Sequence, residues 1–503
     1  MQKSKTMYKY ILLLFLGAGL LSCETLEEVP FSSLSVENLY QNEEDVDAAL
    51  FGVYSSLNVG NNDLWYFLAT SGPGESVVVR LKGDGNQGQL SSLTFNPTTA
   101  HGTWWPNFYR MINRANSVMA NVDKAGLGMD VEEEKIAEAR FLRAFAYFNL
   151  VKWFGGVPLH LEETTDFSDE AVKKPRASVQ EVYDVIVEDL IYAESRLPAN
   201  WDGPDRGRAT SGAAKGFLGK VYLNMAGLPL RQTDKYALAA EKFQEVVSGG
   251  QYMLQENFGD VFSINNEFNS ELIFIRPNVR ADGAGTVLTF FAGAPNTPFA
   301  NRNGQYQFGF TQQFYDSFDS TDLRRDETLM YSYVDAAGRP VTYNDPNNPQ
   351  LPFGGYNGDK GIAFGKLKDG QNDISAFAHT NDLIYMRYAD ILLMLAESLN
   401  ESGQSAQALP FLNQVRQRAG LADVTTTDQA ELRAIIKQER KWELAGEYQE
   451  YPDLQRWGDI EASLANNRDA QIFNTEYRPA IELLPIPQGQ IDVNENLEQN
   501  PGY

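Results

Sequence analysis

Few residues of this 503-residue chain are spaced in a way that would support catalysis. The three histidines, His101, His160 and His379, have no partners at the spacing of a zinc motif such as H-E-x-x-H, and neither a G-x-S-x-G motif nor a phosphate-binding loop occurs. Among 67 acidic residues a pair of carboxylates can always be chosen, so they do not indicate a glycosidase. The sequence therefore predicts a protein that is not an enzyme and uses no cofactor or catalytic metal.

One segment fits a nucleotide-binding pattern. Residues 83–88 read G-D-G-N-Q-G, a match to G-x-G-x-x-G, and follow the strand-like run S-V-V-V-R-L. A dinucleotide site needs a helix to begin at once, because its pyrophosphate binds the amides at a helix N-terminus. The continuation Q-L-S-S-L-T-F-N-P favours strand and turn. We therefore interpret the segment as a glycine-rich loop.

The only cysteine, Cys23, follows a typical signal peptide. Three lysines in the first nine residues precede an apolar run over residues 10–21, which is shorter than the roughly 20 residues of a membrane span. The tetrapeptide L-L-S-C resembles the bacterial lipobox, so we expect residues 1–22 to be removed and Cys23 to be acylated. The acidic run E-T-L-E-E that follows resembles the signal that sends lipoproteins of Bacteroidetes-type bacteria to the cell surface; a solvated linker is the alternative.

Composition limits which classes of function and fold remain possible. The formal net charge of −25 argues against binding nucleic acid through its phosphates. With 43% hydrophobic residues, the chain can bury a large core. We expect residues 23–503 to form one domain with an N-terminal half, 23–230, and a C-terminal half, 270–503.

Apolar residues recur every three or four positions over much of the chain, which predicts a mainly α-helical protein. Small residues and glycine turns follow the pattern of tetratricopeptide-like helical pairs. Two segments, 58–106 and 278–380, lack this period and are rich in Gly, Asn and Pro, so we expect the ligand to bind there. The predicted helices cover residues 131–154, 179–197, 211–226, 236–247, two within 387–420, and one from 429 to about 446.

Several long stretches together resemble the SusD/RagB family of nutrient-binding lipoproteins. They include A-E-A-R-F-L-R-A-F-A-Y-F-N-L-V-K-W-F-G-G-V-P-L at 137–159, G-R-A-T-S-G-A-A-K-G-F-L-G-K-V-Y-L-N-M-A-G at 207–227, R-Y-A-D-I-L-L-M-L-A-E-S-L-N-E-S-G at 387–403, and E-R-K-W-E-L-A-G-E-Y-Q-E-Y-P-D-L-Q-R-W-G at 439–458. The resemblance covers nearly the whole mature chain.

This resemblance implies a SusD-like fold with four tetratricopeptide-like helical pairs and an irregular, loop-rich half that binds the ligand. It also implies a SusC-like TonB-dependent transporter as partner, over which the lipoprotein acts as a lid. The protein would then be anchored to outer-membrane lipid through Cys23 and face the extracellular side. Its ligand would be a polysaccharide or oligosaccharide.

The matched stretches themselves are better interpreted as structural. Three phenylalanines on one helical stripe favour core packing over ligand contact, and so do three residues of a preceding helix. The charged residues of the last motifs are expected to pair within the fold. These residues are Phe141, Phe145 and Phe148; Trp105, Tyr109 and Ile112; and Arg440, Glu443 and Arg456.

The resemblance places the ligand site in two loop regions, which correspond to residues 65–89 and 283–308. Sugar sites commonly set an aromatic ring against a pyranose and surround it with amide, arginine and carboxylate groups. Arg80, Lys82 and Arg302 favour an anionic glycan, because arginine forms paired hydrogen bonds with carboxylates. The alternative ligands are a neutral glycan and a peptide of the RagB kind. The alternative classes of protein are a surface glycoside hydrolase and a scaffold that binds only protein. The candidate ligand-binding residues are Trp65, Arg80, Lys82, Asn86, Gln87, Phe299, Arg302, Asn303 and Tyr306.

Overall fold

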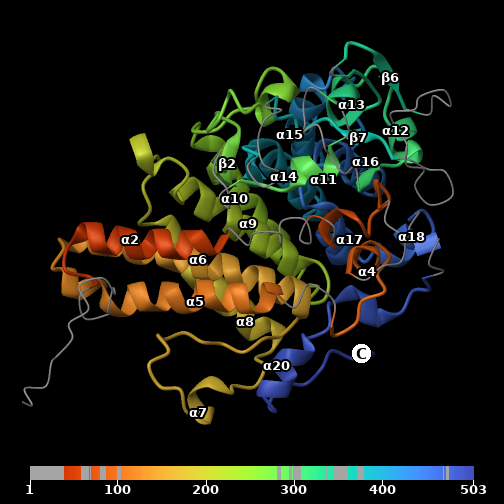
Figure 1. The fold of residues 1–503 in the computed structure, drawn as a ribbon. Coiled ribbons are helices and arrows are strands. Elements are labelled where there is room, and N and C mark those ends of the chain that lie inside the picture. The colour runs from red at the N-terminus through yellow and green to blue at the C-terminus, as the bar shows by residue number, and fades with distance from the viewer. Residues whose placement is uncertain are drawn as a thin grey trace, which may run out of the picture.

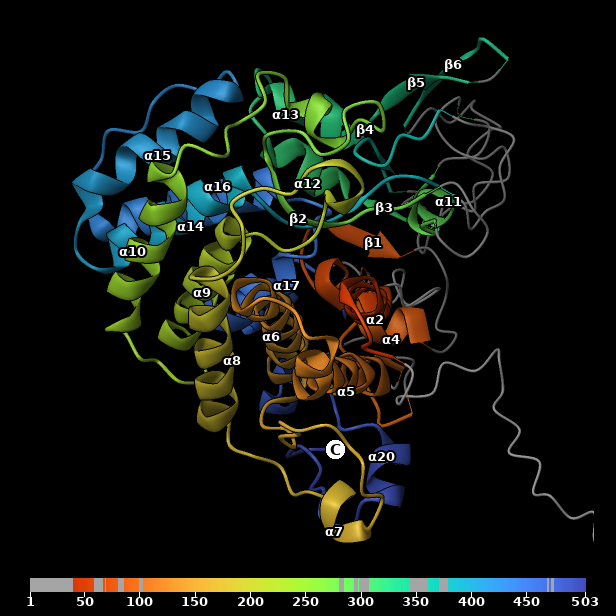
Figure 2. The ribbon, with the colours of Figure 1, turned by 90° about the vertical axis from the view of Figure 1, so that its left-hand side faces the viewer.

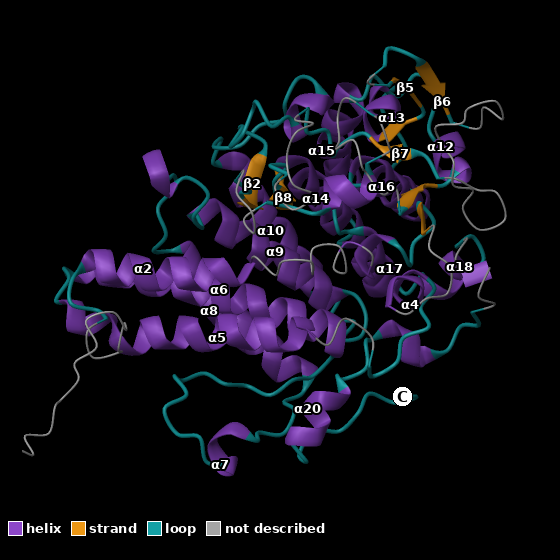
Figure 3. Cartoon of the chain, viewed as in Figure 1, coloured by secondary structure: helices purple, strands orange, loops and turns teal. Residues whose placement is uncertain are grey.

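The computed structural model describes residues 39–57, 67, 69–79, 86–98, 103–279, 285–293, 297, 307–335, 337–343, 361–370, 379–467, 470–471 and 475–503. Helices dominate this part of the chain and the strands are short, which confirms the predicted mainly α class (Figure 3). The helices of ten or more residues are α2 (Glu43–Tyr54), α5 (Trp104–Asn121), α6 (Met129–Phe154), α8 (Val179–Glu194), α9 (Ser211–Ala226), α10 (Lys235–Ser248), α14 (Tyr388–Glu401), α15 (Ser405–Arg418) and α16 (Gln429–Glu443).

Local sequence signals set where these helices begin and end, so their predicted bounds agree closely with the structure. Ser178 and Glu181 form a capping box at the start of α8, in which each side chain accepts a hydrogen bond from the other residue's backbone N–H. Helix α6 ends at Phe154 because Gly155 adopts a left-handed φ of 74°. Helix α9 has the bounds predicted from its period, residues 211–226.

Neighbouring helices along the chain pack on one another. Contacts join α5 to α6, α6 to α8, α8 to α9, α9 to α10, and α10 to α14, which also contacts α15 and α16. The layers therefore continue from the N-terminal half into the C-terminal half (Figures 1 and 2). The assignment of each pair as a tetratricopeptide-like unit stays a prediction.

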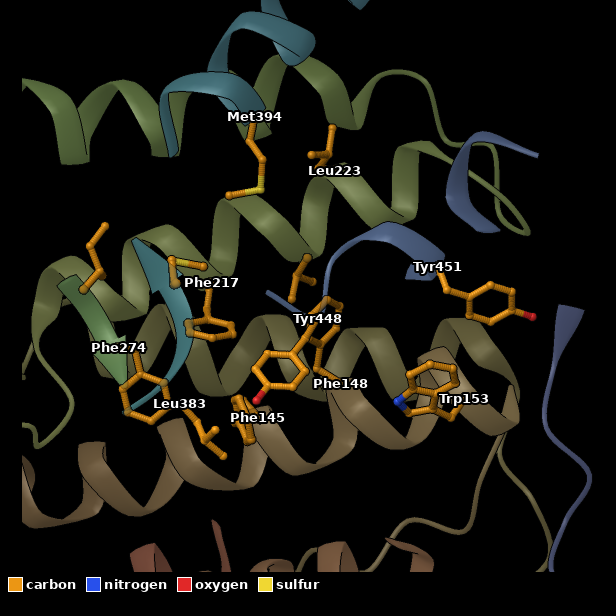
Figure 4. Close-up of a cluster of buried hydrophobic side chains, with 14 of the residues drawn as sticks. Phe145, Phe148, Trp153, Phe217, Leu223, Phe274, Leu383, Met394, Tyr448 and Tyr451 are labelled. Atoms are coloured by element: carbon orange, nitrogen blue, oxygen red, sulfur yellow. The ribbon is translucent and has the colours of Figure 1, made fainter. Parts of the chain in front are cut away.

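The hydrophobic core lies between these layers. Phe145 of α6, Phe217 of α9 and Phe274 of strand β2 (Leu272–Arg276) turn toward one another, with ring centroids 5.7 Å apart in each pair (Figure 4). Edge-to-face packing of this kind adds to the stabilisation from burial. The predicted core roles are confirmed for Phe141, Phe145, Phe148, Trp105 and Ile112, which are all buried, whereas Tyr109 is partly buried and donates a hydrogen bond to the carbonyl of Pro158.

The charged residues of the C-terminal motifs form a buried network, as the sequence predicts. Arg440 pairs with Asp390 and Asp453, and Arg456 pairs with Glu397 and Asp453. Glu443 is fully buried, and the guanidinium groups around it hold the pKa of its carboxyl well below its ordinary range against the opposing effect of burial. Its partners are Arg324, Arg387 and Arg418.

The strands of the described residues form four two-stranded sheets. Strand β2 pairs with β8 (Leu383–Arg387), β4 (Leu329–Met330) with β7 (Ala363–Phe364), and β5 (Ser332–Val334) with β6 (Pro340–Thr342). Strand β1 (Val77–Val79) pairs with β3 (Phe308–Phe310), and this sheet joins the two halves of the chain.

Shorter helices complete the described fold, and one of them corrects the interpretation of the glycine-rich segment. Helix α4 (Asn86–Ser91) begins within the G-x-G-x-x-G pattern, so the expected strand was wrong there, whereas the turns expected after it are present at residues 92–93 and 97. It has only six residues, and the preceding strand β1 pairs antiparallel with β3 rather than within a parallel βαβ unit. The other short helices are α7 (Asp169–Val172), α11 (Leu288–Ala292), α12 (Gln312–Ser317), α13 (Leu323–Thr328), α17 (Glu450–Trp457), α18 (Ile460–Leu464) and α20 (Gln488–Val493).

Candidate functional site

The two predicted ligand regions meet at the β1–β3 sheet. Residue Val79 is opposite Phe308, and Val77 is opposite Phe310, in an antiparallel register. The first region continues past Val79, and the second region ends at Phe308. The part of the first region that follows Val79 and the part of the second region that precedes Phe308 therefore leave the sheet at the same end, whereas the start of the first region leads into Val77 at the other end.

The individual candidate residues fall largely outside the described part of the chain. Asn86 and Gln87 lie in the first turn of α4, and the structure describes their backbone only. The remaining candidates stay predictions, and so does the acylation of Cys23. Those outside the described residues are Cys23, Trp65, Arg80, Lys82, Phe299, Arg302, Asn303 and Tyr306.

A buried aromatic cluster packs around strand β3 of the β1–β3 sheet. Phe67 of the first region stacks on Phe308 of the second, with ring centroids 4.9 Å apart, and meets Phe364 and Tyr448 edge to face. Phe310 stacks on Phe364 at 4.0 Å. All five rings are buried. The cluster ties both regions to strand β7 and to the segment that precedes α17.

Glu450 at the start of α17 fixes the segment that leads into β1. Its carboxylate accepts hydrogen bonds from the backbone N–H groups of Glu75 (2.8 Å) and Ser76 (3.3 Å), and from the Ser76 hydroxyl. An added Cβ at Gly74 would lie 2.0 Å from the carboxyl carbon of Glu450, so this position needs glycine. The sequence placed Glu450 in a family motif but gave it no role.

Further side chains hold the same segment. The amide of Asn467 donates hydrogen bonds to the carbonyls of Gly72 (3.0 Å) and Gly74 (2.6 Å). The backbone N–H of Thr311 donates to the carbonyl of Ser76 at 2.8 Å, and Lys441 pairs with Glu75 at 3.1 Å. The C-terminal half therefore positions the start of the first ligand region.

The second region is held at its base by a polar cluster beside β2 and β8. Thr289 of α11 donates a hydrogen bond to the side chain of Asn381 (2.6 Å), and the Asn278 amide donates to the Asn381 carbonyl (2.6 Å). Asp382 accepts the backbone N–H of Asn278 at 3.0 Å. Burial raises the pKa of Asp382 to about 7.

A ring-lined cavity lies near the first region but is too small for a sugar. Its lining includes Leu57, Trp104, Phe108, Tyr385 and Tyr448. Its volume is about 30 Å³, which holds one or two water molecules, whereas small-molecule sites occupy about 300 to 1,000 Å³. We therefore assign these rings to the scaffold.

The described residues offer little for metal chemistry. No group of three or more His, Cys, Asp or Glu side chains is arranged to hold a metal ion within them. His379 is buried with Nδ1 at 3.4 Å from Asp369, and His160 packs against Tyr109. His101 lies outside the described residues. Among the helices that are described, none is long and apolar enough to cross a membrane.

Comparison with known families agrees with this architecture. A family model described as "SusD family" matches residues 247–503, which is more than half of the chain. The chain belongs to the SusD family. A second model, described as "Starch-binding associating with outer membrane", matches residues 26–223.

Individual relatives resemble this SusD-family protein along most of its length. A SusD-like protein of Formosa agariphila is 28% identical over the full length of both chains. The starch-binding protein SusD of Bacteroides thetaiotaomicron is 25% identical, covering 82% of this chain and 81% of its own. A solved structure of a laminarin-binding SusD-like protein superposes with a TM-score of 0.76 at 26% identity, covering 92% of this chain and 100% of that one. The SusD-like fold predicted from the motifs is confirmed.

Proposed function

We propose that this SusD-family protein is a non-catalytic surface lipoprotein that binds a polysaccharide or oligosaccharide and delivers it to a SusC-like TonB-dependent transporter. The observation that carries the proposal is the pairing of Val79 with Phe308, because the segment after Val79 in the first predicted region and the segment before Phe308 in the second then leave one end of the β1–β3 sheet together. Further support comes from relatives that are named for binding laminarin and starch. Cys23 would carry the lipid that anchors the protein to the outer membrane.

The scaffold holds the described segments that flank the predicted loops. Glu450, Asn467 and the aromatic cluster around Phe67 fix the segments on which the loops are carried. Fixed segments lower the entropy that a ligand must overcome when it orders a loop. Trp65, Phe299 and Tyr306 would supply ring surfaces, and the arginine, lysine and amide candidates would bind hydroxyl or carboxylate groups.

Affinity electrophoresis through gels that contain neutral or anionic polysaccharides tests this proposal. The intact mature protein should be retarded, and an Arg80→Ala/Arg302→Ala variant should be retarded less. An Arg110→Ala variant is the matched control, because Arg110 is an exposed arginine of α5 outside both regions. If no glycan retards the intact protein, the proposal is wrong, and a peptide panel then tests the RagB-like alternative.

Salt dependence and product analysis separate the remaining possibilities. An anionic glycan bound by Arg80, Lys82 and Arg302 should bind more weakly at high salt, since the Debye length shortens from about 10 Å at 0.1 M to about 3 Å at 1 M. Retardation by a neutral glycan that salt leaves unchanged would contradict the roles of these three residues as charge-binding groups. Sustained release of new reducing ends would identify a glycoside hydrolase instead.

A further inference from the structure

A second cleft lies outside both predicted ligand regions. It has a volume of about 530 Å³, within the range of small-molecule sites. It is formed by the turn between α8 and α9, which contains the 3₁₀ helix η4 (Gly203–Asp205), by the turn after α10, and by the segment that leads into β2. None of its lining residues belongs to the β1–β3 sheet or to the aromatic cluster around β3.

Three aromatic residues line this cleft, and hydrogen bonds fix two of them. The indole N–H of Trp201 donates to the carbonyl of Ala209 at 2.7 Å, and the Tyr252 hydroxyl lies 2.9 Å from the Thr210 hydroxyl. The third ring belongs to Phe268. Tyr252 is buried, so the partly exposed rings of Trp201 and Phe268 are the ones that offer apolar surface to a sugar, at little cost in side-chain entropy.

The backbone around Phe268 is unusual for an apolar residue. Phe268 has a left-handed φ of 54°, which is uncommon for a bulky side chain, and such strained residues cluster at ligand sites. Gly207, with φ of 99°, leaves room for the ring, because an added Cβ would lie 3.1 Å from it. The G-R-A-T-S-G motif thus begins with a glycine that the wall of the cleft requires.

Polar groups with remaining hydrogen-bonding capacity surround the rings. Arg206 is exposed, lies 5.0 Å over the Phe268 ring, and pairs with no carboxylate of the described residues. Asp202 is exposed and forms no side-chain hydrogen bond or ion pair with a described residue. Gln251 donates to the side-chain oxygen of Asn200 at 2.8 Å, which leaves the amide of Asn200 available to donate.

The charges in the cleft nearly cancel. The guanidinium of Arg208 is already bound by Asp47, Glu138 and Asp205. What remains is one cation, Arg206, and one anion, Asp202. A polyanion would therefore gain no net attraction, whereas a hydroxyl-rich neutral ligand can use both groups as hydrogen-bond partners.

We propose that this cleft, between the α8–α9 turn and β2, is a second carbohydrate-binding site that takes a neutral pyranose unit of a glycan chain. The proposal rests on the proposed function in one respect, namely that glycans are the ligands of this protein. A second site would lengthen the contact with a polymer, and linked sites raise the overall affinity without new contacts at either one.

The test blocks the cleft without removing a core side chain. In a Cys23→Ala background, an Asp202→Cys variant is labelled with fluorescein maleimide at the rim of the cleft. An Asp130→Cys variant, labelled in the same way, is the matched control, because Asp130 is exposed at the start of α6, outside the cleft. Both carry Arg80→Ala and Arg302→Ala, and both are run on gels that contain laminarin or soluble starch at low and high salt.

We expect the label at residue 202 to weaken the residual retardation at least threefold, the label at residue 130 to leave it unchanged, and salt to have no effect. An unlabelled Arg206→Ala variant should show the same weakening. If the label at residue 202 has no effect while the intact protein is still retarded by these glycans, or if high salt abolishes the residual retardation, the cleft proposal alone is overturned. If no glycan retards the intact protein, both proposals fall.

Discussion

Replacing Glu450 with Ala should loosen the first ligand region from its scaffold. The carboxylate accepts three hydrogen bonds, from the backbone N–H groups of Glu75 and Ser76 and from the Ser76 hydroxyl. A hydrogen bond to a charged acceptor contributes about 1.5 to 3 kcal/mol, and the lower value applies because Glu75 is partly exposed. Three such bonds give a loss of roughly 4.5 kcal/mol in the free energy of unfolding.

The same change should weaken ligand binding, because the ligand must then order the segment that Glu450 holds in the wild type. Every 1.4 kcal/mol of this cost weakens binding about tenfold, so we expect the Kd for a retarding glycan to rise at least tenfold. Urea unfolding and glycan titration measure the two effects.

Lys441→Ala is the control for this experiment, since it removes the partly exposed pair with Glu75, which contributes less than about 1 kcal/mol. A Glu450→Ala variant with the wild-type urea midpoint would refute the energetic argument. A destabilised variant that keeps the wild-type Kd would show that this segment does not support the ligand site.

Three further predictions concern the buried charges and the anchor. Glu443→Gln should lower the free energy of unfolding by about 3 to 5 kcal/mol, because three arginines lose a buried partner. Glu327→Gln is the control: it removes a partly exposed ion pair and should lower the free energy of unfolding by less than about 1 kcal/mol. Urea unfolding midpoints compare the two variants. Burial raises the pKa of Asp382 to about 7, so the folded protein binds the proton of this carboxyl more tightly than the unfolded chain does. The protonated carboxyl therefore stabilises the fold fully below about pH 4, and this contribution is lost as the pH rises through 7. Asp382→Asn should therefore be more stable than wild type at pH 8, by about 1 to 2 kcal/mol after solvent screening, and equal to it near pH 4 in a thermal unfolding series. Cys23→Ala should move the protein from the membrane to the soluble fraction, and continued labelling with palmitate would contradict the lipobox interpretation.

The sequence predicts the helices well because their signals are local. The capping box of Ser178 and Glu181 and the left-handed Gly155 act within one turn of the helix ends that they define. The run S-V-V-V-R-L predicts strand β1, but no local signal gives its pairing with β3, because each strand has only three residues, all buried, and no alternation of polar and apolar positions sets a register. The partners of Val77 and Val79 lie in the other half of the chain, and only the tertiary structure brings them together.

The location of the family motifs explains why the sequence predicts the fold much better than it predicts ligand specificity. Arg387, Glu443 and Arg456, which stand in the most recognisable stretches, are buried among ion-pair partners and cannot touch a ligand. Their pairing constrains the residue types at those positions, because removing one partner of a buried pair costs several kcal/mol. The cleft residue Arg206 carries no such constraint, since it is exposed and pairs with no carboxylate of the described residues. Relatives at 25 to 28% identity can therefore share the scaffold while their loop residues differ, and experiments on specificity should begin with the loops and the cleft.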